Sequence, residues 1–322
     1  MRLVPNACTF ALILVAASTW PSSADADVRP TGPLVPSSGA LLGAYVNTNH
    51  NTTITGYQND LLAFETDMGR HLDINHQYYG FASSFTNVWP LTWDIAAGRI
   101  PLISWGRTSS STINAGTDDA IIRARADEIA ALGAPVFLEW SWEMDIHAAI
   151  SGSPSVFIAA WQHMHDIFVA EGATNAVWVW CPTSLGFAKG KAQPYYPGPD
   201  YVDWVCSDGY NWGNVKPNAP WRTFSTIFKA FYTWGLTTGK PLMIGEYGCG
   251  ERGPGEKAAW LLDARTKLET TFPSIEAALY FDSEDWKHHY DWRLNSSPDA
   301  YAAFHDMAND PYFNQSAAPP SG

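Results

Sequence analysis

Pro135-Val-Phe-Leu-Glu-Trp-Ser-Trp-Glu143 is a short apolar run that ends on a glutamate, and Pro241-Leu-Met-Ile-Gly-Glu-Tyr-Gly248 repeats this pattern further along the chain. Both runs predict buried strands, because continuous apolar runs of this length are typical of strands covered on both faces. A carboxylate at the exit of such a strand costs free energy unless another group satisfies or uses it. Glu143 and Glu246 therefore mark a shared polar site if both strands belong to one closed sheet.

Six further apolar runs alternate with longer helical patterns between residues 40 and 285. This alternation predicts a parallel sheet crossed by helices. The eight predicted strands cover residues 41–46, 74–79, 100–105, 136–142, 176–181, 202–210, 241–247 and 277–282. Eight parallel strands are what a closed barrel requires. We therefore predict a single-domain α/β protein with the (β/α)8 TIM barrel fold.

The composition suits one large domain and argues against a nucleic-acid partner. The chain has 322 residues, 46% of them hydrophobic, and a formal net charge of -13. Only 19 basic residues stand against 32 acidic ones and they form no basic run, whereas phosphate binding needs clustered Lys and Arg. The 16 Trp and 14 Tyr residues exceed the needs of the core, and such rings pack well against sugar faces.

The N-terminus has the pattern of a signal peptide: Arg2, then an apolar stretch over residues 9–17, then the small-residue pattern Ala24-Asp-Ala26. We expect residues 1–26 to be removed on secretion, 27–38 to form an N-terminal lead, 39–312 to form the catalytic domain and 313–322 to be a disordered tail. No later stretch approaches the length of a membrane span, so we expect no membrane partner. We also expect a monomer.

Three cysteines remain after the predicted cleavage, which suggests one disulfide and one free thiol in an oxidising compartment. Cys181 and Cys206 lie on neighbouring predicted strands and are the favoured pair, and Cys249 would then be the free thiol. We expect no metal and no cofactor, because His163 and His165 are spaced so that they do not share a helix face.

The two strand-end glutamates fit the chemistry of retaining glycoside hydrolysis. That reaction needs two carboxyl groups about 5 to 5.5 Å apart, one to protonate the leaving oxygen and one to attack the anomeric carbon. Strand alternation would place Glu139 and Glu143 on one side of their strand. Either glutamate alone is more simply an ordinary strand-end residue, but their joint placement favours the catalytic interpretation.

The segments around Glu143, Val202-Asp-Trp-Val-Cys-Ser-Asp-Gly-Tyr-Asn-Trp212 and the run that ends at Gly248 resemble strands four, six and seven of glycoside hydrolase family 26. The family consists of (β/α)8 barrels and includes β-mannanases, with some members acting on β-xylans or mixed-linkage glucans. The resemblance implies that Glu143 is the acid/base and Glu246 the nucleophile. It also implies that Tyr210 holds the nucleophile, and it places Trp105 and Trp286 near the sugar.

Two positions depart from the family pattern. Family members have His directly before the acid/base glutamate and Arg four residues before that glutamate. This chain has Trp142 and Glu139 there, so the sugar specificity stays open. An inward carboxylate at position 139 must find a partner or stay protonated, and His76 or Arg107 could serve as that partner.

The remaining candidates are residues at other strand ends. Asp208 is expected to support the site rather than to catalyse, and His76 is included with the residues that bind substrate. Trp142, Trp105, Trp212 and Trp286 are candidate stacking platforms, of which we expect about half to touch the ligand.

We predict a secreted, β-mannanase-like endo-glycanase that cleaves a β-linked polysaccharide or oligosaccharide by double displacement. We expect Glu143 to begin the reaction protonated and Glu246 to begin it ionised. A non-catalytic glycan-binding protein on the same barrel is the alternative. An enzyme that acts on a non-glycosidic bond also remains open.

Overall fold

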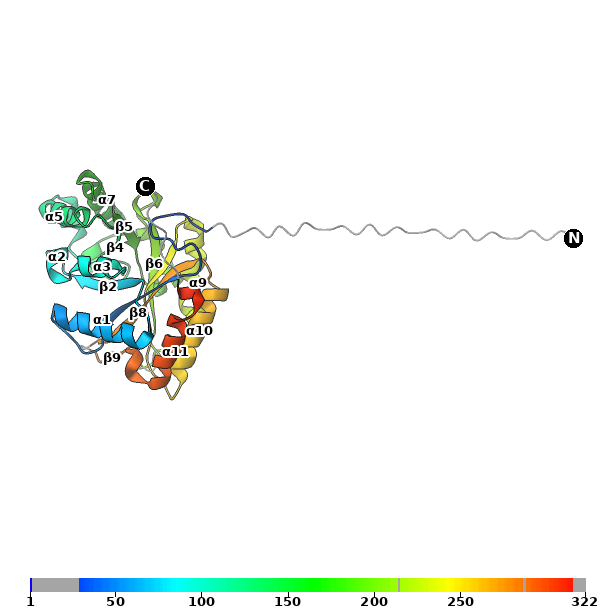
Figure 1. Cartoon of the computed structure of the whole chain (residues 1–322). Coiled ribbons are helices and arrows are strands. Elements are labelled where there is room, and N and C mark those ends of the chain that lie inside the picture. The colour runs from blue at the N-terminus through cyan, green and yellow to red at the C-terminus, as the bar shows by residue number, and fades with distance from the viewer. Residues whose placement is uncertain (2–28, 214, 286–287, 315–322) are drawn as a thin grey trace.

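The computed structural model describes residue 1 and residues 29–213, 215–285 and 288–314. Its first eight strands are parallel neighbours in sequence order, and the first also pairs with the eighth, so the sheet closes into a barrel (Figure 1). The predicted (β/α)8 fold is confirmed. The predicted signal peptide, Trp286 and residues 315–322 of the predicted tail lie outside the described residues. Phe313 is fully buried, so the folded part extends beyond the predicted boundary at residue 312.

All eight predicted strands are present, with ends that differ by a few residues. They are β1 (Leu41–Asn47), β2 (Ile74–Tyr79), β3 (Ile100–Trp105), β4 (Val136–Trp140), β5 (Ala176–Trp180), β6 (Trp204–Asn211), β7 (Leu242–Cys249) and β8 (Ile275–Asp285). A short strand, β9 (Tyr290–Asp291), pairs antiparallel with the end of β8. Because parallel barrel strands all end at one face, the ends of β4, β6 and β7 gather there, as the placement of a shared site requires.

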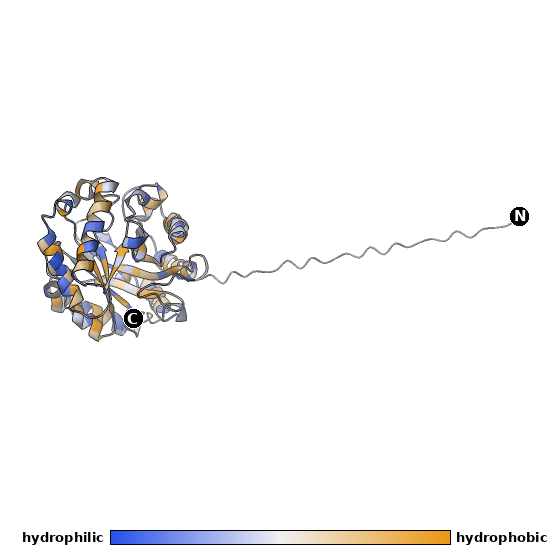
Figure 2. Ribbon diagram, turned by 90° about the horizontal axis from the view of Figure 1, so that it is seen from above, coloured by the Kyte–Doolittle hydropathy of each residue, from blue (hydrophilic) through white to orange (hydrophobic). Residues whose placement is uncertain are grey.

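Helices surround the strands in a ring (Figure 2). They are α1 (Ile54–Met68), α2 (Phe85–Val88), α3 (Leu91–Ala96), α4 (Ser110–Asn114), α5 (Asp119–Ala130), α6 (Ala148–Ser151), α7 (Pro154–Ala170), α8 (Ser184–Ala188), α9 (Phe224–Gly235), α10 (Glu256–Thr270) and α11 (Pro298–Ala308). The apolar residues of α9 recur at helical spacing. Its N-cap Thr223 accepts a hydrogen bond from the Thr226 amide, and Phe224, Phe228 and Phe231 are buried.

The barrel interior changes from apolar to polar along its axis. Leu41, Ile74 and Leu102 occupy the interior at the amino-terminal ends of their strands, in one buried apolar cluster. Further along two of these strands, at the same alternation, stand His76 and Ser104, which are also buried. The polar groups are therefore concentrated toward the carboxyl-terminal face, where the site is expected.

The N-terminal lead closes the opposite end of the barrel. Leu34 and Val35 are buried in the interior apolar cluster, and the Trp204 indole donates a hydrogen bond to the Pro33 carbonyl at 2.9 Å. Arg29 forms an ion pair with the fully buried Glu276 at 3.7 Å. The described part of the lead, from Arg29 onward, therefore acts as a plug at the base of the barrel.

The favoured disulfide is present: Cys181 and Cys206 are bonded, and Cys249 is a buried free thiol. The bond joins the end of β5 to β6, the strand that carries Asp208 and Tyr210. Among the described residues, no helix is both long and apolar enough to cross a membrane.

Candidate active site

Glu143 reaches the site from a tight turn and not from a strand. β4 ends at Trp140, and both Ser141 and Glu143 have left-handed backbone conformations, with φ of 52° and 55°. Such conformations are uncommon for residues other than glycine and are kept only where neighbouring groups hold them. The Glu143 amide donates to the Cys181 carbonyl at 2.7 Å, and the Ser141 amide donates to the Trp105 carbonyl at 3.0 Å. The predicted strand alternation through Glu143 is therefore wrong, although the residue does arrive at the site.

Glu246 lies on β7 and is held by two tyrosine hydroxyls. Tyr210 on β6 donates to Oε2 and Tyr78 on β2 donates to Oε1, each at 2.5 Å. The residue is only 7% exposed. With one donor on each oxygen, the carboxylate cannot rotate freely, so its position in the cleft is fixed before any substrate arrives.

Burial is the largest influence on the ionisation of Glu246 and raises its pKa to about 7, with the charge of Glu143 as the second cause. The hydrogen bonds from Tyr210 and Tyr78 act in the opposite direction, as does the charge of Arg107. When Glu143 carries a proton its charge disappears, so the pKa of Glu246 falls. The two tyrosines and Arg107 therefore favour the anion at Glu246, against the effects of burial and of the charge of Glu143.

Both glutamates line one open cleft of about 1070 Å³, here called the main cleft. Its walls are rich in aromatic rings from several strands. Tyr45 stacks on Phe281 with 5.2 Å between ring centroids, and Tyr78 lies 5.3 Å from Trp142. Tightly packed rings of this kind offer flat apolar faces with fixed orientation, which suits the binding of sugar rings.

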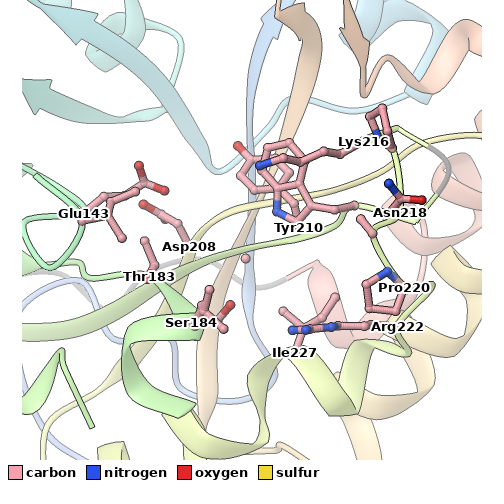
Figure 3. Close-up of a pocket in the computed structure, with 16 residues that line it drawn as sticks. Glu143, Thr183, Ser184, Asp208, Tyr210, Lys216, Asn218, Pro220, Arg222 and Ile227 are labelled. Atoms are coloured by element: carbon pink, nitrogen blue, oxygen red, sulfur yellow. The ribbon is translucent and has the colours of Figure 1, made fainter. Parts of the chain in front are cut away.

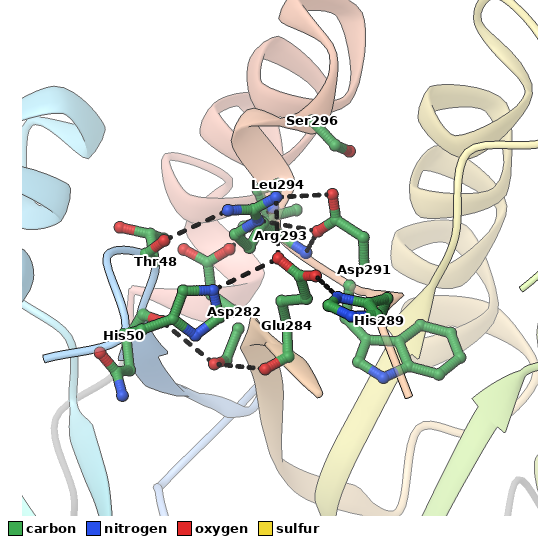
Figure 4. A network of polar contacts seen from close by, with 12 residues as sticks. Thr48, His50, Asp282, Glu284, His289, Asp291, Arg293, Leu294 and Ser296 are labelled. Carbon is green, nitrogen blue, oxygen red and sulfur yellow. Dashed lines mark hydrogen bonds and ion pairs between the residues drawn. The ribbon is translucent and has the colours of Figure 1, made fainter. Parts of the chain in front are cut away.

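A network of charged side chains forms one rim of the main cleft, between the loop after β1 and the end of β8 (Figure 4). Glu284 is its centre, with His50 at 3.3 Å, His289 at 3.1 Å and Arg293 at 3.3 Å. Arg293 also binds Asp291 at 2.9 Å. This end of the cleft is therefore bordered by carboxylates that are already paired with cations.

A second cavity of about 500 Å³, here called the side pocket, opens beside the main cleft (Figure 3). Glu143, Ile146, Tyr210 and Trp212 line both cavities, whereas Glu246 lines only the main cleft. The rest of the side pocket comes from Asp208 and Gly209 on β6, the start of α8, the loop between β6 and α9, and Ile227 on α9. The two cavities therefore meet at Glu143.

A buried polar chain lies beneath the glutamates. Ser104 donates a short hydrogen bond to Glu139, and the same hydroxyl contacts His76 Nε2 at 2.6 Å. Burial raises the pKa of Glu139 to about 8, and the charges of Glu246 and Glu143 add to this effect. Glu139 thus finds its partner in Ser104, with His76 one step further away, and holds its proton at neutral pH.

Arg107 is the cation that faces these carboxyl groups. Its Nη2 donates to the Trp142 carbonyl at 2.7 Å, and its guanidinium lies 4.2 Å from the centre of the Trp142 ring. Its charge acts on Glu143, Glu139 and Glu246. Arg107 therefore fixes Trp142 in the wall of the main cleft and offsets part of the negative charge of the site.

Asp208 lies close to the disulfide and to Glu139. One ligand atom from each of Glu139, Cys181, Cys206 and Asp208 falls within 4.8 Å of the others, a spacing that could suit a metal ion. The disulfide, however, occupies both sulfur atoms, so neither is available as a thiolate ligand. Burial raises the pKa of Asp208 well above its usual range, with the charge of Glu246 as the second cause. Asp208 thus lines the side pocket as a buried carboxyl group, consistent with a supporting role.

The other sequence-predicted residues divide into two groups. Tyr210, Trp142 and Trp212 line the main cleft. Trp105 does not, because the inward position on β3 belongs to Ser104, and Trp105 faces outward, where its ring stacks on Phe81 at 4.9 Å. His76 is buried below Tyr78 and also lines neither cavity.

Two residues important to the site escaped prediction from the sequence. Tyr78 shares the inward alternation of His76 at the end of β2, so strand periodicity could have found it. Trp292 lies after β9 and packs on Tyr210 with 4.7 Å between ring centroids. No spacing in the sequence indicates that a loop after the last strands would turn back onto β6.

A (β/α)8 barrel that carries two glutamates in one aromatic cleft at its carboxyl-terminal face has the parts that a glycoside hydrolase needs. The sequence model of glycosyl hydrolase family 26 matches residues 138–246, a range that includes both glutamates. Endoglucanase H of Acetivibrio thermocellus is 31% identical over 283 residues, which cover 84% of this chain and 30% of that protein. The chain therefore spans less than a third of the length of this curated relative.

Solved structures show the same fold at lower identity. A family 26 β-mannanase from Bacteroides ovatus superposes with a TM-score of 0.59 at 14% identity, covering 86% of this chain and 90% of that one. A modular endo-β-1,4-mannanase from Cellulomonas fimi gives a TM-score of 0.58 at 16% identity, covering 88% and 76%. The chain belongs to glycoside hydrolase family 26.

Proposed function

We propose that this protein is a secreted retaining endo-glycanase that cleaves a β-linked polysaccharide by double displacement at Glu143 and Glu246. The observation that carries the proposal is the different anchoring of the two carboxyl groups in one cleft. Glu246 is buried and held by Tyr210 and Tyr78, whereas the Glu143 side chain is 22% exposed and borders both cavities. A fixed anion suits a nucleophile, and a carboxyl group open to leaving group and water suits an acid/base.

In the first step, Glu143 donates its proton to the glycosidic oxygen as Glu246 attacks the anomeric carbon. The bond to the leaving sugar breaks and an ester to Glu246 forms. Water then enters on the side that the leaving group vacated, Glu143 removes its proton, and the ester bond is broken. The sugar product keeps the β configuration because each step inverts the anomeric centre once.

The relatives and the cleft support the proposed substrate class. Relatives in this family include an endoglucanase and β-mannanases, so β-glucans and β-mannans are the first candidates. Trp142 stands in the wall of the main cleft, held by Arg107, and offers a flat ring to a pyranose face. Export is supported by the disulfide, because such bonds persist in oxidising compartments.

Hydrolysis of a panel of β-mannans, β-xylans and β-glucans, read as released reducing ends, tests the proposal. The wild-type protein should release oligosaccharides from at least one of them, and Glu246→Ala should lower kcat by about 10⁴-fold or more. Glu269→Gln on α10 is the matched control, because it changes a carboxylate whose side chain is 30% exposed outside the cleft. Tight oligosaccharide binding without cleavage would instead select a glycan-binding protein.

A further inference from the structure

The side pocket differs from the main cleft because Lys and Arg side chains line it. Lys216 and Arg222 project toward it from the loop between β6 and α9, opposite Glu143 and Asp208 (Figure 3). Within the described part of the chain, neither cation forms an ion pair with a carboxylate. Most arginines elsewhere are paired: Arg70, for example, lies 2.9 Å from Asp73, and Arg99 lies 2.6 Å from Glu65. In a chain of net charge -13, two unpaired cations at one cavity form a local site for an anion.

The two carboxyl groups in the side pocket do not cancel this charge during the reaction. Asp208 is only 2% exposed, and burial raises its pKa well above the usual range, which favours its neutral form. Glu143 must carry a proton when it begins to protonate the leaving oxygen. The main cleft differs, since Glu246 lines it and must be an anion there when it attacks the anomeric carbon. A negatively charged group is therefore favoured in the side pocket and disfavoured in the main cleft.

The walls of the side pocket suit a sugar ring. Ile146 and Leu185 are large hydrophobic residues that line it while being 57% and 42% exposed, and Pro217 and Pro220 add further apolar surface. Trp212 presents its ring to the pocket, with Lys216 Nζ 5.7 Å from the ring centre. A cation held over an aromatic ring that lines the pocket suits a pyranose that carries a carboxylate, because the apolar walls contact the sugar ring and the cation binds the charge.

The side pocket can be assigned to one end of the substrate, because it lies beside only one of the two glutamates. The side pocket contacts Glu143 but not Glu246. The glycosidic oxygen that Glu143 protonates departs with the leaving sugar, whereas the sugar bound to Glu246 stays in the main cleft. The side pocket therefore lies on the side of the leaving group.

We infer that the side pocket binds a sugar unit bearing a carboxylate on the leaving-group side, with Lys216 and Arg222 binding the charge and Trp212 the ring. This inference rests on the proposed function for its orientation, but the pocket itself is testable without cleavage. It makes the protein a glycanase that prefers acidic, carboxylate-substituted polysaccharides to neutral ones.

Binding is measured first, by NMR titration of the protein with glucuronate and, separately, with glucose at low salt. Glucuronate should bind about fivefold more tightly than glucose, since two exposed ion pairs contribute only modestly. The preference should disappear in Lys216→Met/Arg222→Met and weaken as salt rises, because exposed charges are screened. Lys229→Met on α9 is the matched control, an exposed lysine outside the pocket, and should keep the preference. Equal binding of both sugars by the wild-type protein would overturn the inference.

Cleavage is measured second, on the polysaccharide that the protein hydrolyses fastest and on the same polymer after light carboxymethylation. The inference predicts a KM about fivefold lower for the carboxymethylated form, lost in the double variant and kept in Lys229→Met. A KM that is equal or higher for the acidic polymer contradicts the inference while leaving the proposed hydrolysis intact. Absence of cleavage of every polymer would contradict the proposed function, and the glucuronate titration would still decide whether the pocket binds anionic sugars.

Discussion

The main cleft and the side pocket meet at Glu143, but they are built from different parts of the chain. The main cleft takes its key groups from barrel strands, with Tyr78 on β2, Tyr210 on β6 and Glu246 on β7. The side pocket takes Leu185 from a short helix and Lys216 and Arg222 from a loop. Glu143 comes from the turn after β4, so the contrast applies to the groups that hold the nucleophile: strands fix Glu246 and its tyrosines, whereas a loop supplies the cations of the side pocket. Changes in the first region should lower kcat, and changes in the second should alter KM.

After loss of either glutamate, the largest loss of kcat is expected from removal of the tyrosine hydroxyls that hold Glu246. Tyr210→Phe and Tyr78→Phe should each lower kcat by about 10- to 100-fold, because each removes a hydrogen bond to a charged group. The same bonds lower the pKa of Glu246, so their loss raises it, and the acid limb of the kcat/KM profile should move to higher pH. A change in KM alone, with an unmoved acid limb, would contradict this role.

A smaller effect is expected at Lys257, a fully buried cation on α10 that holds the loop bearing Trp292. Its Nζ donates to the carbonyls of Trp292 at 3.0 Å and Arg293 at 2.5 Å, and to Ser296 Oγ at 3.1 Å. Lys257→Met should lower the free energy of unfolding by about 3 kcal/mol, because three acceptors lose their donor. It should also lower kcat, since Trp292 supports Tyr210.

Chemical denaturation at several pH values measures the stability change, with Lys267→Met on the same helix as the partly exposed control. If Lys257→Met unfolded no more easily than Lys267→Met, the buried cation would not be the anchor of this loop.

The last effect concerns Glu139, acts on stability and depends on pH. Its pKa is raised from 4.5 to about 8 in the folded protein, so between these values the folded state binds a proton that the unfolded state has released. Stability should therefore fall as pH rises through this window, by up to about 1.4 kcal/mol per pH unit from this group. Glu139→Gln keeps a neutral side chain at every pH and should flatten the decline. Parallel stability curves for the two proteins, measured from pH 5 to 8, would show that Glu139 carries no such proton.

Strand positions were predictable from the sequence because burial leaves a continuous apolar signal. The ends of β2 and β3 coincide with the predicted runs 74–79 and 100–105. β4 is shorter than predicted, because the left-handed residues Ser141 and Glu143 end the strand early. No local pattern announces such a turn, since its conformation is held by carbonyl groups of other strands.

The candidate site was predictable where it lies on strands and less so elsewhere. Glu246 and Tyr210 stand where strand ends and the family resemblance placed them. Trp105 was misplaced because aromatic identity does not reveal which face of β3 a residue occupies, and here the inward face belongs to Ser104. Trp292 and Lys216 come from loops, whose return path over the barrel depends on tertiary contacts and not on residue spacing.

The stereochemistry of azide rescue tests the assignment of Glu246 and Glu143 most directly. In Glu246→Ala, azide can occupy the place of the missing carboxylate and displace an activated aryl β-glycoside once, so the account predicts an α-glycosyl azide. In Glu143→Ala, Glu246 still forms the ester and azide then attacks it, so a β-glycosyl azide is expected. Proton NMR distinguishes the two products. A β-glycosyl azide from Glu246→Ala, or an α-glycosyl azide from Glu143→Ala, would contradict the assigned roles.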